Sequence, residues 1–376
     1  MIYGFLLGKN PELSLAELSH YLKNRDIKFN IIKMSHNFCV AETNINPSIL
    51  SKDLGGTIKI GEYYEYEKMI DEIASKEKPR FGLSVYPKSK KTYDSIKNEI
   101  AANLKQTGAR YVFVSSKFHG NTELKHFEVL KKILKKEGIE IMVFCNGRKY
   151  FFRTVAVHDP SQFKKRDVKR PVQRTIYSIP PRLAKILINL CAKPGDNLLD
   201  PFCGIGTIMQ EAMLMNIFPI GVDKNPRCIK GAETNLKWIE QIYKIDKGFQ
   251  LVEGDATKLS DYFEEESIDC IATEPYLGPP LKSKPKKDKA ERIINNLKNL
   301  YLEFLIEASK VLRQKGKMSI VFPNFMTIDG KEIKMNIEEI ASSCGLKVLE
   351  LVNGKKSIVD ADERQMTRRE IALLQK

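Results

Sequence analysis

The sequence predicts an α/β protein of more than one domain, with a mostly parallel sheet in its C-terminal half. From Ser178 onward, apolar runs typical of strands alternate with helical patterns, in the βαβ manner that makes neighbouring strands parallel. Two shorter α/β regions come first, and a basic segment follows them. The 376 residues are 42% hydrophobic and 29% charged, which is typical of a globular protein with a large buried core.

Composition shifts divide the chain into four parts. We expect an N-terminal region over 1–77, a second α/β domain over 78–157, a basic linker over 158–177 and a C-terminal domain over 178–376. In the first part, Ser14-Leu15-Ala16-Glu17 has the form of a capping box and predicts the start of a helix. In the second, the patterns predict strands over 81–85, 111–114, 139–145 and 150–157, and helices over 96–104 and 127–136.

The C-terminal domain holds seven predicted strands and five predicted helices. The strands are expected over 197–199, 219–222, 250–252, 268–272, 317–322, 346–352 and 369–374. The helices are expected over 182–190, 207–215, 228–243, 290–312 and 333–344.

The charge balance indicates the class of partner. The formal net charge is +15, and a basic excess of this size favours association with nucleic acid or with an anionic membrane surface. No basic amphipathic helix with a Trp/Phe/Leu face stands out, and the longest apolar runs are far too short to span a bilayer. Nucleic acid is therefore the expected partner, with no membrane association.

Cysteine usage indicates the compartment. The seven cysteines are scattered and form no C-x-x-C pair, which is typical of a reduced cytoplasmic protein without a metal site.

A glycine-rich block follows the first predicted strand of the C-terminal domain, and it reads Asp200-Pro201-Phe202-Cys203-Gly204-Ile205-Gly206-Thr207. Ligands of open parallel sheets bind at the carboxyl ends of the strands, and a helix that starts there offers free N–H groups. A nicotinamide site is disfavoured, because Met209 stands where the third glycine would be and Asp200 would repel a pyrophosphate. An acid there would instead attract the amino group or sulfonium of S-adenosylmethionine.

Two more acids follow the next two strands. Asp223 ends the second strand and could accept hydrogen bonds from two ribose hydroxyls, and Asp255 follows the third and could accept the adenine amino proton. Each acid alone could equally be a helix cap. Because three stand in order at strand ends, we expect the cofactor site to comprise these blocks, namely Asp200, Pro201, Phe202, Cys203, Gly204, Gly206, Thr207, Asp223, Asp255 and Ala256. Cys203 is expected to be a small packing residue and not a nucleophile.

The fourth strand is followed by Glu274-Pro275-Tyr276-Leu277-Gly278. Together with the three earlier blocks, this segment resembles the class I S-adenosylmethionine-dependent methyltransferases that methylate amino groups, whose fourth block reads Asp/Asn-Pro-Pro-Tyr/Phe. The upstream Tyr177-Ser178-Ile179-Pro180-Pro181-Arg182-Leu183-Ala184 resembles one branch, the tRNA guanosine-10 N2-methyltransferases.

The resemblance implies a Rossmann-like C-terminal domain with a seven-stranded sheet, a ferredoxin-like region over 1–77 and a THUMP-like RNA-binding domain over 78–157. It implies transfer of a methyl group from S-adenosylmethionine to the exocyclic N2 amine of a tRNA guanosine, with S-adenosylhomocysteine as product. It leaves open whether one or two methyl groups are added and whether a small activating subunit is needed. A monomer is the default expectation.

The same resemblance implies roles for Glu274, Pro275 and Tyr276. A side-chain acceptor at Glu274 and the backbone carbonyl of Pro275 would accept the two N–H bonds of the amine and aim its lone pair at the methyl group. An aromatic ring beside them would stack on the base. This chain departs from the pattern, since Glu replaces Asp or Asn, Tyr276 stands one place early and Leu277 fills the aromatic position.

Two lysine- and arginine-rich segments are candidate RNA contacts. The basic linker is expected to be exposed and either merely solvated or laid along a phosphate backbone, and its candidates are Lys164, Lys165, Arg166, Lys169, Arg170 and Arg174. The segment 282–289 is expected to be a lid that orders on RNA or, alternatively, a solvated loop, with candidates Lys282, Lys284, Lys286 and Lys287.

Two other functions stay open. A DNA adenine or cytosine amino-methyltransferase shares the fourth block but normally carries a target-recognition domain. A catalytically silent RNA-binding protein that keeps the cofactor pocket is supported by the altered Glu274-Pro275-Tyr276-Leu277 block.

Overall fold

The computed structural model describes residues 1–376 except 119, 174–177 and 362–364. The chain forms two compact units, one of Met1–Ser14 with Asp26–Phe163 and the other of Leu15–Arg25 with Lys164–Lys376. Most of helix α1 (Pro11–Lys23) therefore belongs to the second unit. Every helix in the described part of the chain is too short or too polar to cross a membrane.

The first unit is built on one eight-stranded sheet with the order β2-β3-β1-β4-β8-β7-β5-β6. Its strands are β1 (Ile2–Leu7), β2 (Phe29–Ser35), β3 (Phe38–Thr43), β4 (Thr57–Tyr63), β5 (Arg80–Tyr86), β6 (Val112–Val114), β7 (Ile139–Asn146) and β8 (Arg148–Val157). Its other helices are α2 (Pro47–Asp53), α3 (Tyr66–Ala74), α4 (Lys90–Gln106) and α5 (His126–Glu128). In chain order, β1, α1, β2, β3, α2 and β4 follow the βαββαβ sequence of a ferredoxin-like fold, and the strand order β2-β3-β1-β4 agrees with it.

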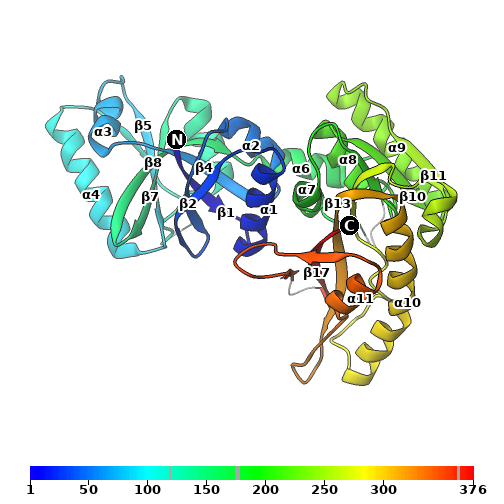
Figure 1. Ribbon diagram of the computed structural model, residues 1–376. Helices are drawn as coiled ribbons and strands as arrows, with labels where there is room; N and C mark the ends of the chain where they lie inside the picture. The colour runs from blue at the N-terminus through cyan, green and yellow to red at the C-terminus, as the bar shows by residue number, and fades with distance from the viewer. Residues whose placement is uncertain (119, 174–177, 362–364) are drawn as a thin grey trace. The chain divides into compact units, whose positions relative to one another are not determined.

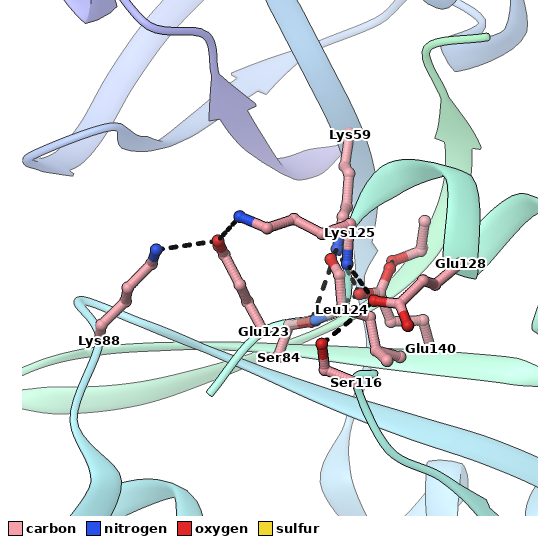
Figure 2. Close-up of polar contacts among 10 residues, drawn as sticks. Lys59, Ser84, Lys88, Ser116, Glu123, Leu124, Lys125, Glu128 and Glu140 are labelled. Atoms are coloured by element: carbon pink, nitrogen blue, oxygen red, sulfur yellow. Dashed lines mark hydrogen bonds and ion pairs between the residues drawn. The ribbon is translucent and has the colours of Figure 1, made fainter. Parts of the chain in front are cut away.

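One buried polar cluster ties the middle of this sheet together (Figure 2). The Lys59 ammonium on β4 forms an ion pair with Glu140 on β7 and donates to the carbonyl of Leu124 at 2.6 Å. Ser84 on β5 donates to the same carboxylate at 2.6 Å, and Thr154 on β8 donates to its other oxygen at 2.7 Å. Lys59 and Glu140 are 1% and 0% exposed, so each charge depends on the other for its stability.

The second unit is built on a nine-stranded sheet (Figure 1). Seven strands follow one path with the order β11-β10-β9-β12-β13-β17-β15, in which β11 to β13 pair in parallel and β17 pairs antiparallel with both neighbours. These seven are the seven predicted strands, so the predicted Rossmann-like, mostly parallel sheet is confirmed. Two further strands, β14 and β16, pair with β13 and β17.

The strands of this sheet are β9 (Asn197–Asp200), β10 (Phe218–Asp223), β11 (Gln250–Glu253), β12 (Ile268–Thr273), β13 (Leu312–Met326), β14 (Glu332–Lys334), β15 (Lys347–Leu349), β16 (Ser357–Asp360) and β17 (Thr367–Gln375). The helices are α6 (Pro160–Val168), α7 (Pro181–Cys191), α8 (Thr207–Leu214), α9 (Pro226–Tyr243), α10 (Lys287–Val311) and α11 (Ile337–Ser343).

Helices cover both faces of the sheet. One face packs against α8 and α9 through a cluster that includes Met209, Met213 and Leu236. The other face packs against α10 and α11 through a larger cluster around Tyr301 and Phe304 (Figure 1). Because helices cover both faces, a ligand can reach the parallel strands at their carboxyl ends.

Four predicted elements are wrong in part. The helix expected to start at Ser14 begins at Pro11, and the Ser14 hydroxyl donates to the carbonyl of Asn10. The expected helix over 127–136 is broken into α5, a π turn (Val129–Ile133) and a 3-10 turn (Leu134–Lys136). The expected helix over 333–344 starts only at Ile337, because Glu332–Lys334 pairs with β13 as β14. The expected linker over 158–177 contains helix α6.

Removing one partner of the Lys59–Glu140 pair should destabilise the first unit. Lys59→Met leaves a buried carboxylate without its cation, so we expect the free energy of unfolding to fall by about 3–5 kcal/mol. Hydrogen exchange of the amides of β4, β7 and β8 measures it. In the double variant with Glu140→Gln, the charge penalty is absent and part of the stability should return. A double variant as unstable as the sum of the two single variants would contradict the coupling.

Candidate active site

The ends of β9 and β12 meet at the point where the strand order reverses. Thr273 Oγ1, at the end of β12, donates a 2.7 Å hydrogen bond to Asp200 Oδ1, at the end of β9. A small pocket opens beside this contact, and its lining residues are Ser178, Ile179, Asp200, Phe202, Cys203, Gly204, Ile205, Thr207, Ile208 and Glu274. The structure thus brings together Glu274 and five of the predicted cofactor residues.

Asp200 is a buried acid whose charge is only partly compensated. It is 2% exposed, and the removal of water raises the pKa of its carboxyl to about 7. The Thr273 hydroxyl and the Phe202 N–H, which donates at 3.3 Å, oppose this rise, whereas the nearby Asp223 and Glu274 add to it. A cation brought into the pocket would favour the ionised form of Asp200.

The glycine block lies between β9 and α8, and within it Gly204 is half-buried while Gly206 is buried. Gly204 and Gly206 have φ of 52° and 83°, a region that glycine enters without strain. A Cβ on Gly204 would meet nothing within 4 Å, so the main chain there has room for a ligand to approach. A Cβ on Gly206 would lie 3.3 Å from the Cβ of Ala232 on α9, so this glycine permits close helix packing instead.

Asp223 supports the glycine block. Its Oδ2 accepts the N–H of Gly204 at 3.0 Å, and its Oδ1 accepts the N–H of Asn225 at 2.8 Å. The end of β10 therefore fixes the conformation of the loop after β9. Asp223 does not line the small pocket but lies beside it through this contact.

Asp255 acts as a cap. Its Oδ1 accepts the N–H and the hydroxyl of Thr257, at 3.0 and 2.9 Å, at the start of a 3-10 turn (Ala256–Asp261). The backbone hydrogen bond from Thr257 lowers the pKa of the Asp255 carboxyl, so it is ionised at neutral pH. Oδ1 of Asp255 therefore caps this turn. A contact between Asp255 and adenine stays a prediction. Asp255, Ala256, Pro201 and Gly206 are not part of the small pocket's lining.

Cys203 has the properties of a packing residue. It is 5% exposed, and burial raises the pKa of its thiol well above the ordinary value. Its Sγ lies 3.0 Å from where a Cβ on Gly221 would stand, so the two residues pack closely. A buried, protonated thiol is a poor nucleophile, in agreement with the predicted role.

The two carboxylate oxygens of Glu274 have different surroundings. Arg369, a buried residue of β17, donates from Nε to Glu274 Oε1 at 2.9 Å. Within the described part of the chain, the buried Oε2 has no hydrogen-bond partner. Burial raises the pKa of Glu274, and the charge and hydrogen bond of Arg369 oppose that rise. Buried carboxylate oxygens normally accept a hydrogen bond, so Oε2 is suited to accept one from an N–H of a ligand.

The next two residues of the block differ in exposure. Pro275 is buried, whereas Tyr276 is 46% exposed at the rim of the site. The hydroxyl of Tyr301, on α10, lies 3.5 Å from the Tyr276 carbonyl and 3.2 Å from the Val321 carbonyl. The backbone after Glu274 is thus held against the core while the Tyr276 ring faces outward.

The basic residues of the linker do not share one environment. Lys164, Lys165 and Lys169 are exposed, but Arg166 and Arg170 are only 4% and 3% exposed, so the expectation of an exposed linker is wrong for these two. Arg166, on α6, contacts Glu211 of α8, and Arg170, two residues after the end of α6, contacts Thr207 of α8. The sequence around them has no apolar periodicity, so it did not indicate these contacts. Arg174 lies outside the described residues.

The lysines of the basic segment after the fourth block are exposed, but the last three of its eight residues, 287–289, are helical. Lys282, Lys284, Lys286 and Lys287 all face solvent. Helix α10 begins at Lys287, so the segment expected to be a lid extends only to Lys286.

Sequence reasoning missed Arg369 and Ser178 as site residues. Arg369 lies 95 positions from Glu274, on a strand whose place beside β13 only the folded sheet reveals. Ser178 stood within the quoted upstream segment but carried no chemical signal of its own.

The chain matches two family models and several known proteins. A model described as RMKL-like, methyltransferase domain matches residues 166–345, and one described as DNA methylase matches residues 58–234. The chain is 28% identical over 330 residues to the tRNA (guanine(10)-N2)-dimethyltransferase of Methanothermobacter thermautotrophicus, which covers 86% of this chain and 89% of that protein. A solved SAM-dependent methyltransferase from Methanosarcina mazei aligns with 50% of this chain and 96% of its own, at 15% identity and a TM-score of 0.38.

A second relative has a higher sequence identity over a shorter stretch. Over 120 residues the chain is 36% identical to a protein of Methanothermococcus thermolithotrophicus named "Probable tRNA (guanine(10)-N2)-dimethyltransferase", covering 31% of this chain and 70% of that one. With its strand order, its acid-lined pocket and these relatives, the chain belongs to the family of the tRNA (guanine(10)-N2)-dimethyltransferases.

Proposed function

We propose that the protein transfers methyl groups from S-adenosylmethionine to the exocyclic N2 amine of guanosine 10 in tRNA. Family membership supports the reaction and the substrate. The observation that carries the proposal is the unpartnered, buried Oε2 of Glu274 beside a pocket that holds a second buried acid, Asp200. This arrangement matches a substrate amine that donates to Glu274 and a cationic cofactor that lies beside Asp200.

The pocket fits S-adenosylmethionine on its own chemistry. The bare backbone at Gly204 leaves room for the ligand, and Asp200 favours a cation. Asp200, Gly204 and Thr207 would hold the methionine part, and Asp223 and Asp255 would lie toward the ribose and the adenine. When bound, S-adenosylmethionine supplies a methyl group on a sulfonium, which is an electrophile.

Glu274 would prepare the amine. The lone pair of a guanine N2 is delocalised into the ring, and hydrogen bonds from its two N–H groups to Glu274 Oε2 and the Pro275 carbonyl would help to localise it. As the new N–C bond forms, the S–C bond to the leaving S-adenosylhomocysteine breaks and the nitrogen becomes positive. Its proton would then pass to the Glu274 carboxylate. Tyr276 is 46% exposed, and its ring would stack on a base turned out of the helix.

We assign RNA contact to the first unit, as the THUMP-like resemblance of 78–157 implies, and to the exposed lysines of the second. These are Lys164, Lys165, Lys169, Lys282, Lys284, Lys286 and Lys287. Ammonium groups facing solvent bind phosphates without reading sequence, so they would orient the tRNA and leave base choice to the pocket.

Replacing Glu274 should abolish most of the activity while leaving cofactor binding intact. Glu274→Ala removes the acceptor, and we expect methyl transfer to tRNA to fall by about 10²–10³-fold. Transfer of labelled methyl groups followed by nucleoside analysis measures it, with N2-methylguanosine or N2,N2-dimethylguanosine as product. Tyr276→Leu is a matched variant at the rim of the site, with a smaller expected loss.

Three outcomes would contradict this assignment. A different methylated nucleoside would exclude the substrate, and equal transfer to duplex DNA would favour the amino-methyltransferase alternative, which the DNA methylase model keeps relevant. Cofactor binding with no transfer to any tRNA would favour the silent RNA-binding protein.

Arg369 should set the pH dependence of the reaction. Glu274 must be ionised to take up the proton that the amine loses, and Arg369 keeps its pKa from rising further. In Arg369→Gln the pKa of Glu274 should rise, so the acidic limb of the kcat profile should move to higher pH. Arg369→Lys retains the charge and should move it less. Unchanged limbs in both variants would contradict the role of Arg369.

Asp200 should release a proton when the cofactor binds. With a pKa of about 7, this carboxyl is mostly protonated at pH 6.5, and a bound cation would favour its ionised form. Calorimetric titrations with S-adenosylmethionine at pH 6.5, in buffers of different ionisation enthalpy, should show about 0.5–1 proton released per ligand. Asp200→Asn should release none, and a wild-type protein that releases none would contradict this assignment.

A further inference from the structure

Arg170 is a buried cation, and within the part of the chain that the structure describes its guanidinium donates to neutral groups. Its Nη1 donates to Thr207 Oγ1 and its Nη2 donates to Ser178 Oγ, each at 2.7 Å. The residue is 3% exposed, and its buried Nε has no partner among the described residues. The positive charge of the guanidinium is therefore not matched by a carboxylate at hydrogen-bond distance.

Arg166, four residues earlier, shows the usual solution for a buried arginine. It donates from Nε and Nη2 to the two oxygens of Glu211, at 2.5 and 3.0 Å. Burial lowers the pKa of Arg166, but the attraction of Glu211 outweighs it and the net shift is upward. For Arg170 the pKa shifts downward through burial, which the more distant charge of Asp167 only partly offsets. Burying an unpaired charge is costly, so such a residue is expected where an anion can join it.

The two hydroxyls that Arg170 contacts line the cofactor pocket. Ser178 and Thr207 are both lining residues, and Thr207 is the first residue of α8, where the helix has unused N–H groups and the positive end of its dipole. Asp200 and Glu274 line the same pocket. The pocket thus has an anion-attracting side and a cation-attracting side, which is the charge pattern of an α-amino acid.

The direction of the hydrogen bonds strengthens this. Arginine has no acceptor, so both hydroxyls must accept from Arg170 and keep their own hydrogens for other partners. The two oxygens lie 3.4 Å apart, so at most one hydrogen is used between them. At least one O–H remains to donate to a ligand.

We propose that Arg170, Ser178 and Thr207 form the subsite for the methionine carboxylate of the cofactor. The proposal rests on the proposed use of S-adenosylmethionine. The hydroxyls of Ser178 and Thr207 donate to the carboxylate, and Arg170 is a positioning residue that orients them and supplies the opposite charge. This gives a buried member of the basic linker a role in cofactor binding in place of RNA contact.

Decarboxylated S-adenosylmethionine, which keeps the amine and the sulfonium but lacks the carboxylate, tests the subsite directly. Calorimetry on the full chain without tRNA gives the affinity for each ligand. In Arg170→Met we expect the affinity for S-adenosylmethionine to fall by about 10–100-fold, and that for the decarboxylated ligand to change less than about twofold. Lys169→Met, an exposed neighbour, should change neither affinity.

The outcomes separate the two proposals. Equal losses for both ligands in Arg170→Met would mean a structural role and overturn the subsite, and Arg170→Lys, which keeps a buried cation, should then behave no better. Unchanged affinity for S-adenosylmethionine would overturn it as well. A wild-type chain that binds neither ligand would contradict the proposed cofactor, and the carboxylate subsite with it.

Discussion

The hydrogen bond from Thr273 to Asp200 joins two strand ends at the point where the order of the sheet reverses. The rest of the site depends on this contact. It brings the glycine block after β9 and the Glu274 block after β12 to one edge, 73 positions apart in the chain. Asp223, at the end of β10, accepts the N–H of Gly204 and so fixes the glycine block. Covered faces leave this edge as the place where a ligand can meet several strands at once.

The pocket at this edge is defined by charges that the fold compensates incompletely. Asp200 carries a raised pKa. Among the described residues, Glu274 Oε2 has no hydrogen-bond partner and the Arg170 guanidinium donates to two hydroxyls. Elsewhere the same protein pairs its buried charges closely, as in Arg166 with Glu211 and Lys59 with Glu140. Since unpaired buried groups cost stability, their concentration around one pocket favours a binding role for them.

The sequence was sufficient to predict features whose signal is local. Seven of the nine strands of the second sheet follow from hydrophobic runs and turn residues. Asp200, Gly204 and Glu274 follow from their places at strand ends. The interruption after Glu128 and the short β14 were not predicted, because a π turn and a three-residue strand carry no periodicity of their own. Helix α6 was missed because its buried side depends on charged residues.

Pairings between distant residues were beyond the sequence alone. Arg369 reaches Glu274 because β17 inserts beside β13, and nothing in the local sequence of either residue indicates this partner. Arg166 and Arg170 belong to a run of basic residues that reads as uniform, and only packing against α8 separates the buried arginines from the exposed lysines.

The role assigned to Glu274 depends most on which atom accepts the methyl group, and one substrate tests it. A tRNA with inosine in place of guanosine 10 lacks only the exocyclic N2 amine, so its shape and phosphates remain available to the protein. We predict labelled methyl transfer to the unmodified tRNA and none to the inosine-containing one, with both tRNAs binding equally. Equal transfer to the two would place the accepting atom elsewhere and contradict the assignment of Glu274 to a guanine amine.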